Sequence, residues 1–445
     1  MSSPISVRCM KSVRVLGYLL LVLALPLAIG QHQLRIKFAG INSAATGKVT
    51  DLPAPPDLDA MRPTVAVLLG DGGTEASDFL APFSILAASG KYNVFAVAEQ
   101  DRPHNLFPGG LDVMPHYTIA EFNQEAVSQP DVIVLPYMEI LDEQSHKRLM
   151  DWVRVHWQAD TVLVTICGGS MIAADAELLD GRTATSHQNI LEIVRRSQPQ
   201  VNWVDGMRYV ADGNLISSAG ISAGVDVSLY LIRQQFGDAL ARQVAEAGAY
   251  PHTPFLDNAD FQPRTISWFW PGLNAAFSPN RVMGLALYQG ASELTLAALI
   301  DTYTRSFGLQ IQTLSTRGEP VISQHGLVLV QRHEIGQAPA VARVVIAGKP
   351  SDTQREVLQE WSAAQGLVPE ALPGLSYPYD EALHDMARHH SVQLAQFAAD
   401  GLEYPSDHLH LRGPRFPNGA WLNFLLLLLP GMLLLTLLRY GRGHG

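Results

Sequence analysis

Apolar residues along this chain form two long uninterrupted runs near its ends and many short runs between them. The run at 421–438 holds 18 residues without a charge, which is long enough to cross a hydrocarbon core of about 30 Å. The run at 15–30 is shorter and follows a basic segment, which is typical of a signal peptide or an uncleaved anchor. The sequence therefore predicts a membrane segment in residues 1–30 and a transmembrane helix in residues 420–440.

Basic residues flank both runs on their outer sides and predict the topology. They are Arg8, Lys11, Arg14, Arg439 and Arg442. Because such residues mark the cytoplasmic side, we expect both chain ends in the cytoplasm. The body between them is then extracytoplasmic, and in a Gram-negative cell it lies in the periplasm at the inner membrane. Cleavage of the first run would leave the body in the same place.

The body has a different pattern, in which short apolar runs alternate with segments of helical spacing. The apolar runs lie at 65–69, 94–98, 132–135 and 162–166, and the helical segments at 79–88, 142–156 and 170–178. Continuous apolar strands between helices indicate a parallel sheet that is covered on both faces. We therefore predict an α/β fold with a doubly wound, mostly parallel sheet flanked by helices, as in a flavodoxin-like sandwich. Ligands of such folds bind at the carboxyl ends of the strands.

Composition narrows the function. The chain is 47% hydrophobic and only 16% charged, and its net charge is −11. All 42 acidic residues lie between the two end segments, so the body is more acidic than the whole chain. A body of this charge lacks the basic footprint of a nucleic-acid-binding protein, and we expect no nucleic-acid partner.

Cys167 stands out because it is the only cysteine of the body, with Cys9 in the first basic flank. A lone thiol in the body cannot form an intramolecular disulfide. It follows a predicted strand and precedes Gly168, Gly169 and a predicted helix, which is the pattern of a nucleophile on a sharp strand-to-helix turn. The helix N-terminus is expected to lower the thiol pKa, and its N–H groups are expected to receive an oxyanion. A buried apolar cysteine is the alternative.

Four blocks of sequence carry a resemblance to a known family. They are SDFLAPFSIL (77–86), ICGGSMIAADAELLDGRTATSH (166–187), SSAGISAGVDVSLYLI (217–232) and AEAGAYP (245–251). In this order they resemble the PfpI-like family of the class I glutamine amidotransferase-like superfamily. The amidase-like domains of AraC-type regulators and the isocyanide hydratases are the most similar branches. The resemblance covers residues 62–255.

The resemblance implies a cysteine nucleophile at Cys167 and a neighbouring carboxyl group at Asp78. It also implies an imidazole at His187, which is either a base or a structural histidine that fixes its loop. One motif departs from the family, because Pro136, Tyr137 and Met138 replace its usual Pro-Gly-Gly. We expect Tyr137 to close or reshape the pocket, so a standard hydrolase mechanism does not follow from the resemblance. Gly168 and Gly169 are expected to line the oxyanion site.

A second, shorter copy of the pattern follows a linker at 256–280. LAQFAADGLEYP (394–405) matches LARQVAEAGAYP (240–251) at an offset of 154. We predict a truncated, degenerate repeat over 281–410, without the cysteine segment and with Thr295 in the place of Asp78. It is either an inactive partner that forms an intrachain pseudo-dimer or an unrelated α/β module. Residues 31–61 are predicted to be a spacer.

The function remains open between several classes. Cys167 acts on a small amide, isonitrile or carbonyl compound, or the protein is a non-catalytic ligand or redox sensor. Family similarity also suggests a protein like a transcriptional regulator, but no DNA-binding segment is evident. The expected partners are a small molecule and the lipid bilayer. No cofactor or metal is predicted, since the histidines late in the chain lack a nearby cysteine or a spaced glutamate; they are His384, His389, His390, His408 and His410.

Overall fold

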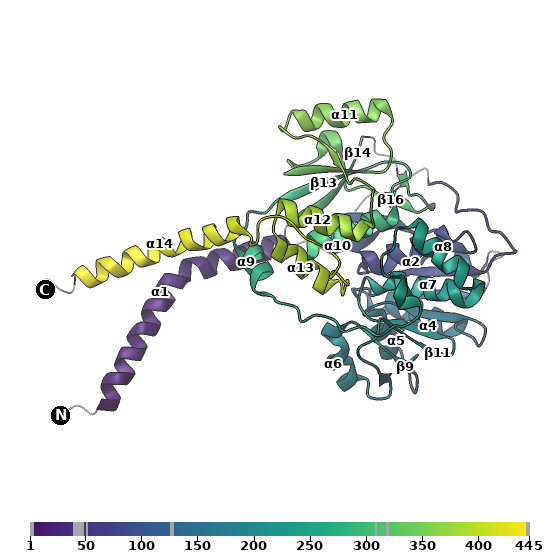
Figure 1. The fold of residues 1–445 in the computed structure, drawn as a ribbon, viewed down its shortest axis with the longest axis horizontal. Coiled ribbons are helices and arrows are strands. Elements are labelled where there is room, and N and C mark those ends of the chain that lie inside the picture. The colour runs from purple at the N-terminus through teal and green to yellow at the C-terminus, as the bar shows by residue number, and fades with distance from the viewer. Residues whose placement is uncertain are drawn as a thin grey trace.

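The computed structural model describes residues 4–38, 49, 52–124, 129–307, 309–316 and 320–441. Its body holds two α/β units, and a pair of long helices leaves the body on one side (Figure 1). The basic flanks Arg8, Lys11, Arg14, Arg439 and Arg442 lie outside the side chains that the structure describes.

The first unit is built on a seven-stranded sheet with the order β11-β12-β8-β7-β1-β3-β6. Its strands are β1 (Thr64–Leu69), β3 (Asn93–Ala98), β6 (Tyr117–Thr118), β7 (Val132–Leu135), β8 (Val162–Thr165), β11 (Tyr209–Asp212) and β12 (Leu215–Ser218). All neighbours are parallel except β11 and β12. Along β1, Val65 and Val67 enter one hydrophobic core and Ala66 and Leu68 enter another, so the sheet is buried on both faces. The predicted α/β class is confirmed.

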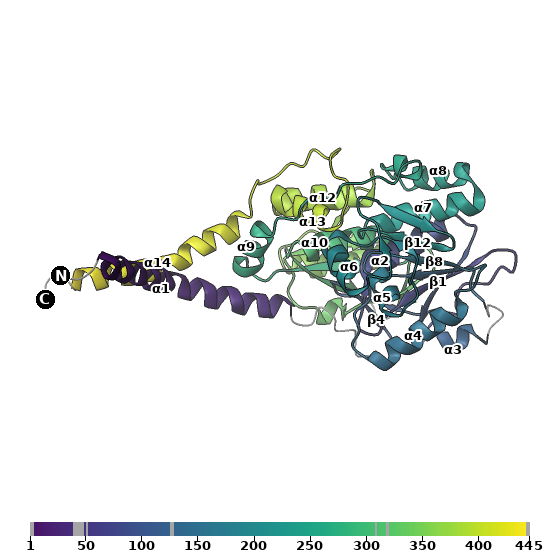
Figure 2. The same ribbon diagram turned by 90° about the horizontal axis from the view of Figure 1, so that it is seen from below.

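Helices cover both faces of this sheet (Figures 1 and 2). They are α2 (Ala76–Ala88), α3 (Ile119–Phe122), α4 (Glu143–His156), α5 (Gly169–Asp175), α6 (Gln188–Ser197), α7 (Ala223–Phe236) and α8 (Asp238–Ala247). Helix α5 ends before the predicted boundary at 178, because Glu177 takes a left-handed conformation with φ 58°. A small parallel pair, β9 (Thr183–Ala184) and β10 (Asn202–Trp203), lies beside the sheet, and a short 3-10 turn follows α8 at Thr253–Leu256.

The second unit has a five-stranded parallel sheet with the order β17-β14-β13-β18-β19. Its elements are β13 (Val282–Leu287), α10 (Glu293–Arg305), β14 (Gln310–Ser315), β17 (His333–Glu334), a 3-10 turn (Ile335–Gln337), β18 (Arg343–Ala347), α11 (Asp352–Ala363), β19 (Glu370–Ala371), α12 (Pro378–His389) and α13 (Val392–Gly401). This order matches β6-β3-β1-β7-β8 of the first sheet, strand for strand in chain order.

The two units share a sheet and a helix interface. Strands β15 (Val321–Ile322) and β16 (Val328–Val330) of the second unit continue the sheet of β2 (Thr74–Glu75), β4 (His104–Phe107) and β5 (Leu111–Met114). Strand β16 pairs with β5 in antiparallel register, with Leu329 opposite Val113. Helix α2 packs on α10, so buried polar groups of the two units meet there. The units therefore form one continuous body.

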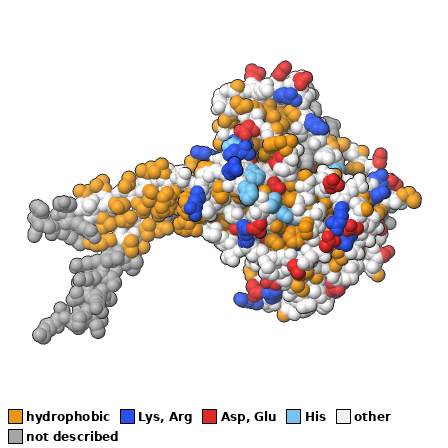
Figure 3. All heavy atoms as spheres, in the orientation of Figure 1, with side chains coloured by type: hydrophobic (Ala, Val, Ile, Leu, Met, Phe, Trp, Pro, Cys, Tyr) orange, Lys and Arg blue, Asp and Glu red, His pale blue; other side chains and the backbone are white. Residues whose placement is uncertain are grey.

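The long terminal helices are α1 (Pro4–Phe38) and α14 (Asn418–Gly441). Within them, Gly17–Lys37 and Asn418–Leu437 are long and apolar enough to cross a membrane, which is weak evidence for membrane association. Hydrophobic side chains cover the described parts of both helices that lie next to the body, and the distal ends lie away from it (Figures 1 and 3). Helix α1 continues past the predicted boundary at residue 30. Its end packs on α9 (Phe269–Phe277), to which Asn423 of α14 also donates a hydrogen bond.

Candidate functional site

Cys167 lies on the turn between β8 and α5, at the carboxyl edge of the first sheet, in a left-handed conformation with φ 54°. A non-glycine residue rarely adopts such a φ and needs surrounding contacts to hold it. The carbonyl oxygen of Cys167 accepts hydrogen bonds from the hydroxyls of Ser170 (2.9 Å) and Ser186 (2.8 Å). A Cβ atom at Gly169 would lie 2.1 Å from the carbonyl oxygen of Leu135, so only glycine fits there. The local geometry is that of a nucleophile elbow.

The ring of Tyr137 narrows access to this turn. A Cβ atom at Gly168 would lie 2.6 Å from Cδ2 of Tyr137, so the ring packs directly on the glycine that follows Cys167. Phe107 contacts the same ring edge to face, with centroids 5.7 Å apart. Cys167 is only 8% exposed. The Tyr137 ring, which stands where the resemblance predicts a glycine, thus limits access to Cys167.

Asp78 is buried in the first turn of α2, and its Oδ2 atom accepts a hydrogen bond from the backbone N–H of Tyr137 (3.1 Å). The carboxylate of Glu75 caps the same helix by accepting from the backbone N–H of Asp78 (2.7 Å). Burial is the main cause that raises the pKa of each carboxyl to about 7, and for Glu75 the nearby charge of Asp78 adds to it. The pair therefore holds protons near neutral pH.

The same surroundings raise the pKa of the Cys167 thiol well above its usual value. Burial is the largest cause, followed by the charges of Asp78 and Glu75. The expectation that the helix terminus lowers this pKa is therefore wrong. Burial of the thiol and the two nearby carboxyls raise its pKa more than the dipole of α5 lowers it, because α5 is only seven residues long. Among the described residues no hydrogen bond joins Cys167 to Asp78.

The second unit supplies the positive charge at this site. Arg305, at the end of α10, donates a hydrogen bond to Glu75 Oε1 (2.6 Å) and pairs with Asp301 one turn earlier (3.2 Å). Asp301 in turn accepts hydrogen bonds from the backbone N–H and the hydroxyl of Ser77. One guanidinium thus faces three buried carboxyls, so the cluster retains protons. Sequence reasoning missed Arg305, Asp301 and Glu75, because only the packing of α10 on α2 brings them together.

His187 caps α6 and does not reach the thiol. Its Nδ1 atom accepts from the backbone N–H of Asn189 (3.1 Å), and its Nε2–H donates to the carbonyl of Gly401 (3.0 Å) in the second unit. Both ring nitrogens are therefore engaged, which is the structural alternative that the sequence left open. Glu403 lies beside it, with Oε1 at 3.6 Å from Nδ1.

Glu403 is a further site residue that the sequence did not predict. It is buried, adopts φ 49°, and its Oε1 atom accepts from the backbone N–H of Gln188 (2.7 Å). Its Oε2 atom is buried without a hydrogen-bond partner in the described structure. Glu403 stands 154 positions after Ala249, the offset of the predicted repeat, and Ala249 also has a positive φ of 54°.

These features match a known family over the first unit: residues 63–234 match the DJ-1/PfpI family model. Residues 63–234 belong to the DJ-1/PfpI family. The transcriptional regulator CdhR of Pseudomonas aeruginosa, named as of the HTH type, is 39% identical over 98 residues, which is 22% of this chain and 29% of that protein. The isonitrile hydratase of Pseudomonas putida is 31% identical over 124 residues, which is 28% of this chain and 50% of that protein. The chain thus spans half or less of the length of these relatives.

Solved structures of the DJ-1/PfpI family resemble part of the chain. Drosophila melanogaster DJ-1beta is 19% identical and matches 42% of this chain and 97% of its own length, at a TM-score of 0.36. A DJ-1 superfamily protein of Salmonella typhimurium is 26% identical and matches 42% of this chain and 99% of its own length, also at a TM-score of 0.36. At these TM-scores the likenesses add nothing to the family assignment.

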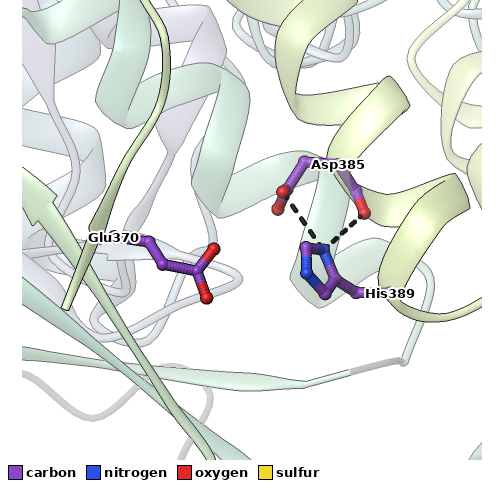
Figure 4. Close-up of side chains that lie close together, drawn as sticks. All are labelled: Glu370, Asp385 and His389. Carbon is purple, nitrogen blue, oxygen red and sulfur yellow. Dashed lines mark hydrogen bonds and ion pairs between the residues drawn. The ribbon is translucent and has the colours of Figure 1, made fainter. Parts of the chain in front are cut away.

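Outside the DJ-1/PfpI segment, Glu370, Asp385 and His389 bring ligand-type atoms within 4.8 Å of one another (Figure 4). Arg343 already occupies the cation position of this cluster. Its guanidinium donates to Glu370 (2.7 Å) and to both oxygens of Asp385, which also pairs with His389 (3.2 Å). We assign this cluster to the internal ion pairing of the second unit.

Proposed function

We propose that this chain is a membrane-tethered member of the DJ-1/PfpI family whose Cys167 acts as a nucleophile on a small, uncharged amide, isonitrile or carbonyl compound. The observation that carries the proposal is the left-handed conformation of Cys167 beside the buried, proton-holding carboxyl of Asp78. A residue held in a strained conformation on an elbow is typical of catalytic nucleophiles.

The protonation states of Cys167 and Asp78 favour uncharged substrates. Cys167 rests as a thiol, and Asp78 has a pKa of about 7, so Asp78 is suited to take the thiol proton and return it. An anionic substrate is disfavoured there because the site is buried and its cation, Arg305, is already paired with Glu75 and Asp301. The Tyr137 ring restricts the size of any substrate that reaches the sulfur.

An isonitrile illustrates a balanced reaction. The sulfur forms a bond to the terminal carbon while the thiol proton, relayed by Asp78, goes to the same carbon and yields a thioimidate. Water then adds to that carbon, the carbon–sulfur bond breaks, and a formamide leaves as the thiol is restored. This hydration consumes one water and needs no oxidant or cofactor.

The proposal includes the placement of the body outside the cytoplasm. Helices α1 and α14 leave the body on the same side and diverge toward their distal ends (Figure 1). Gly431 supports close packing of the two helices, since a Cβ atom there would lie 2.6 Å from the backbone of Val22. This contact favours an uncleaved first helix.

The proposal also assigns the second unit as an inactive partner in an intrachain pseudo-dimer. The Tyr250 hydroxyl donates to Asp226 in the first unit, and the Tyr404 hydroxyl donates to Asp380 in the second. Each residue of the second pair stands 154 positions after its counterpart in the first. The shared strand order and the shared left-handed residue support the same assignment. Arg305 and Glu403 are the residues through which this partner would contribute to the Cys167 site.

Ligand sensing without turnover is the second candidate. It is favoured by the contact of α9 with both terminal helices, which connects the body to the proposed membrane segments. A redox sensor fits less well, because oxidation requires a thiolate and the pKa of Cys167 is raised. The likeness to CdhR covers 29% of that regulator, and we assign no DNA-binding role from it.

Turnover by the full-length protein in lipid nanodiscs tests the proposal. An alkyl isonitrile, a primary amide and a dicarbonyl are supplied separately, and product is followed by mass spectrometry. We expect one class to be consumed by the wild type and by Cys9→Ala, and a loss of at least about 100-fold in Cys167→Ala. Equal turnover by Cys167→Ala would rule out the nucleophile. Binding of a probe without any turnover would favour the sensor.

A further inference from the structure

A cavity lies at the junction between the body and the terminal helices. It has a volume of about 260 Å³ and is bounded by the end of α1, the segment after α9, and the hairpin turn at Gly109 and Gly110. Cys167, Asp78 and Tyr137 are not among its lining residues. The cavity shares Phe107 and Arg305 with the surroundings of Cys167 but does not include the sulfur-bearing residue.

The charge of this cavity is opposite to that of the protein. Four basic residues line it, Lys37, Arg281, Arg305 and Arg332, and within the described part of the chain no acidic residue does. The chain as a whole carries a net charge of −11. Two of these four cations, Arg305 and Arg332, are paired with carboxylates. The charges of Lys37 and Arg281 remain to attract an anion to the cavity.

The four cations differ in how they are held. Arg305 and Arg332 are anchored by carboxylates behind the wall, Glu75 and Asp112. Lys37 donates three hydrogen bonds to Asn274 and Ser278 at the end of α9, and none of these acceptors is a carboxylate. Arg281 is exposed and has no side-chain partner among the described residues. Arg281 is thus the cation most available to a ligand, and Lys37 contributes an uncompensated charge.

The rest of the wall is apolar and aromatic. Trp268 and Phe397 contact each other edge to face with centroids 5.1 Å apart, and Ile266, Phe107 and Leu309 also face the cavity. Trp268 is 58% exposed, although a tryptophan usually gains from burial. A ligand that matches this wall has an apolar body and an anionic head.

We propose that this cavity binds an amphiphilic organic anion, with a carboxylate or phosphate head bound by Arg281 near the positive charge of Lys37, and an alkyl or aryl body against Trp268 and Phe397. The cavity begins where the apolar span Gly17–Lys37 ends, which places it at the level of a lipid headgroup if α1 crosses a membrane. The same chemistry is offered by an acidic lipid and by a soluble amphiphilic acid. Binding does not depend on Cys167.

The test measures binding of octanoate to the full-length protein in nanodiscs of phosphatidylcholine, with octanol as the uncharged probe of equal length. Arg281→Gln removes the available cation, and Arg355→Gln on the exposed face of α11 is its matched control. Trp268→Ala removes the apolar contact, and the neighbouring exposed Phe269→Ala, which does not line the cavity, is its control.

We expect octanoate to bind more tightly than octanol. Arg281→Gln is expected to weaken octanoate about three- to fivefold and to leave octanol unchanged, while Trp268→Ala weakens both. Cys167→Ala is expected to bind octanoate like the wild type, which separates this proposal from the proposed catalysis. Equal affinity for octanoate and octanol, or no effect of Arg281→Gln relative to Arg355→Gln, would overturn the proposal.

The source of the ligand is resolved by changing the bilayer. In nanodiscs that contain phosphatidylglycerol, a lipid ligand would occupy the cavity and suppress octanoate binding to the wild type but not the weaker binding to Arg281→Gln. Unchanged octanoate binding in those nanodiscs would assign the cavity to a soluble acid. Both results support an anionic amphiphile and differ only in where it comes from.

Discussion

The two α/β units share their strand order and differ at the strand that follows β7 or β18. In the first unit β8 leads into Cys167 and α5, whereas in the second unit the short strand β19 leads into a loop and then α12. The second unit keeps the helix that packs at the interface, α10, and from it supplies Arg305 to the first. The difference separates two tasks that a symmetric pair would combine. One unit presents the sulfur, and the other sets the charge around it.

The largest expected effect comes from breaking the ion pair between the units. Arg305→Met leaves Glu75 and Asp301 buried without their cation, and we expect a loss of about 3–5 kcal/mol in the free energy of unfolding. Urea unfolding of the full chain measures it, and the exposed Arg355→Met is expected to change stability by less than about 0.5 kcal/mol. A loss below about 1 kcal/mol would show that the second unit does not stabilise the charges of the first.

A smaller effect, with a defined pH dependence, is expected from Asp78→Asn. The folded-state pKa of Asp78 lies near 7, above its unfolded value, so the wild type binds more protons folded than unfolded between about pH 4 and pH 7. Stability from this group is therefore lost as the pH rises through that window. We expect Asp78→Asn to exceed the wild type by about 1–3 kcal/mol at pH 8 and to lose this advantage at low pH.

The control for that prediction lies in the second unit. Thr295 occupies the matching position of α10, where Ser292 caps the helix as Glu75 caps α2. Thr295→Val is expected to leave the slope of stability against pH unchanged. If Asp78→Asn also leaves this slope unchanged, the carboxyl is ionised in the folded protein throughout the range.

Removal of the Tyr137 ring is expected to affect access to Cys167 more than stability. Tyr137→Ala opens the space over Gly168, and we expect iodoacetamide to alkylate Cys167 roughly tenfold faster. Peptide mass spectrometry measures the rate at this cysteine. Lys349, which follows β18 as Tyr137 follows β7, is exposed, and Lys349→Ala provides the control. An unchanged rate in Tyr137→Ala would mean that another group limits access.

The smallest effect is expected at Glu403. Its charge is the last among the causes that raise the pKa of Cys167, and glutamine preserves the acceptor for the Gln188 N–H. Glu403→Gln is therefore expected to speed alkylation on the order of twofold at pH 7.5. Ala249→Gln, at the matching position of the first unit, is the control. An increase as large as that in Tyr137→Ala would place Glu403 closer to the sulfur than the structure does.

Local sequence patterns predicted most of the first unit. Continuous apolar runs placed β1, β3, β7 and β8, and the strand–Cys–Gly–Gly pattern placed Cys167 on its turn. The family resemblance selected Asp78, which lies close enough for its charge to raise the pKa of Cys167. These features depend on residues near one another in the chain or on a motif that retains its order.

The electrostatics of the site could not be predicted in the same way. Arg305 and Glu75 are 230 positions apart, and Glu403 and Gln188 are 215 apart, so only the packing of the second unit on the first brings them together. The pKa of Cys167 depends on that packing as well as on its own turn. The role of His187 was left open for a similar reason, since its partner Gly401 comes from α13.

The proposed chemistry is tested most directly by trapping the bond to Cys167. The full-length protein in nanodiscs is mixed with whichever of the three probe compounds it consumes. The reaction is quenched in acid within one turnover, and the protein is digested for mass spectrometry. We predict an adduct of the probe's mass on the peptide that carries Cys167, which disappears as product forms and is absent in Cys167→Ala. Product formed at the same rate in Cys167→Ala, or an adduct on any other residue, would contradict the account.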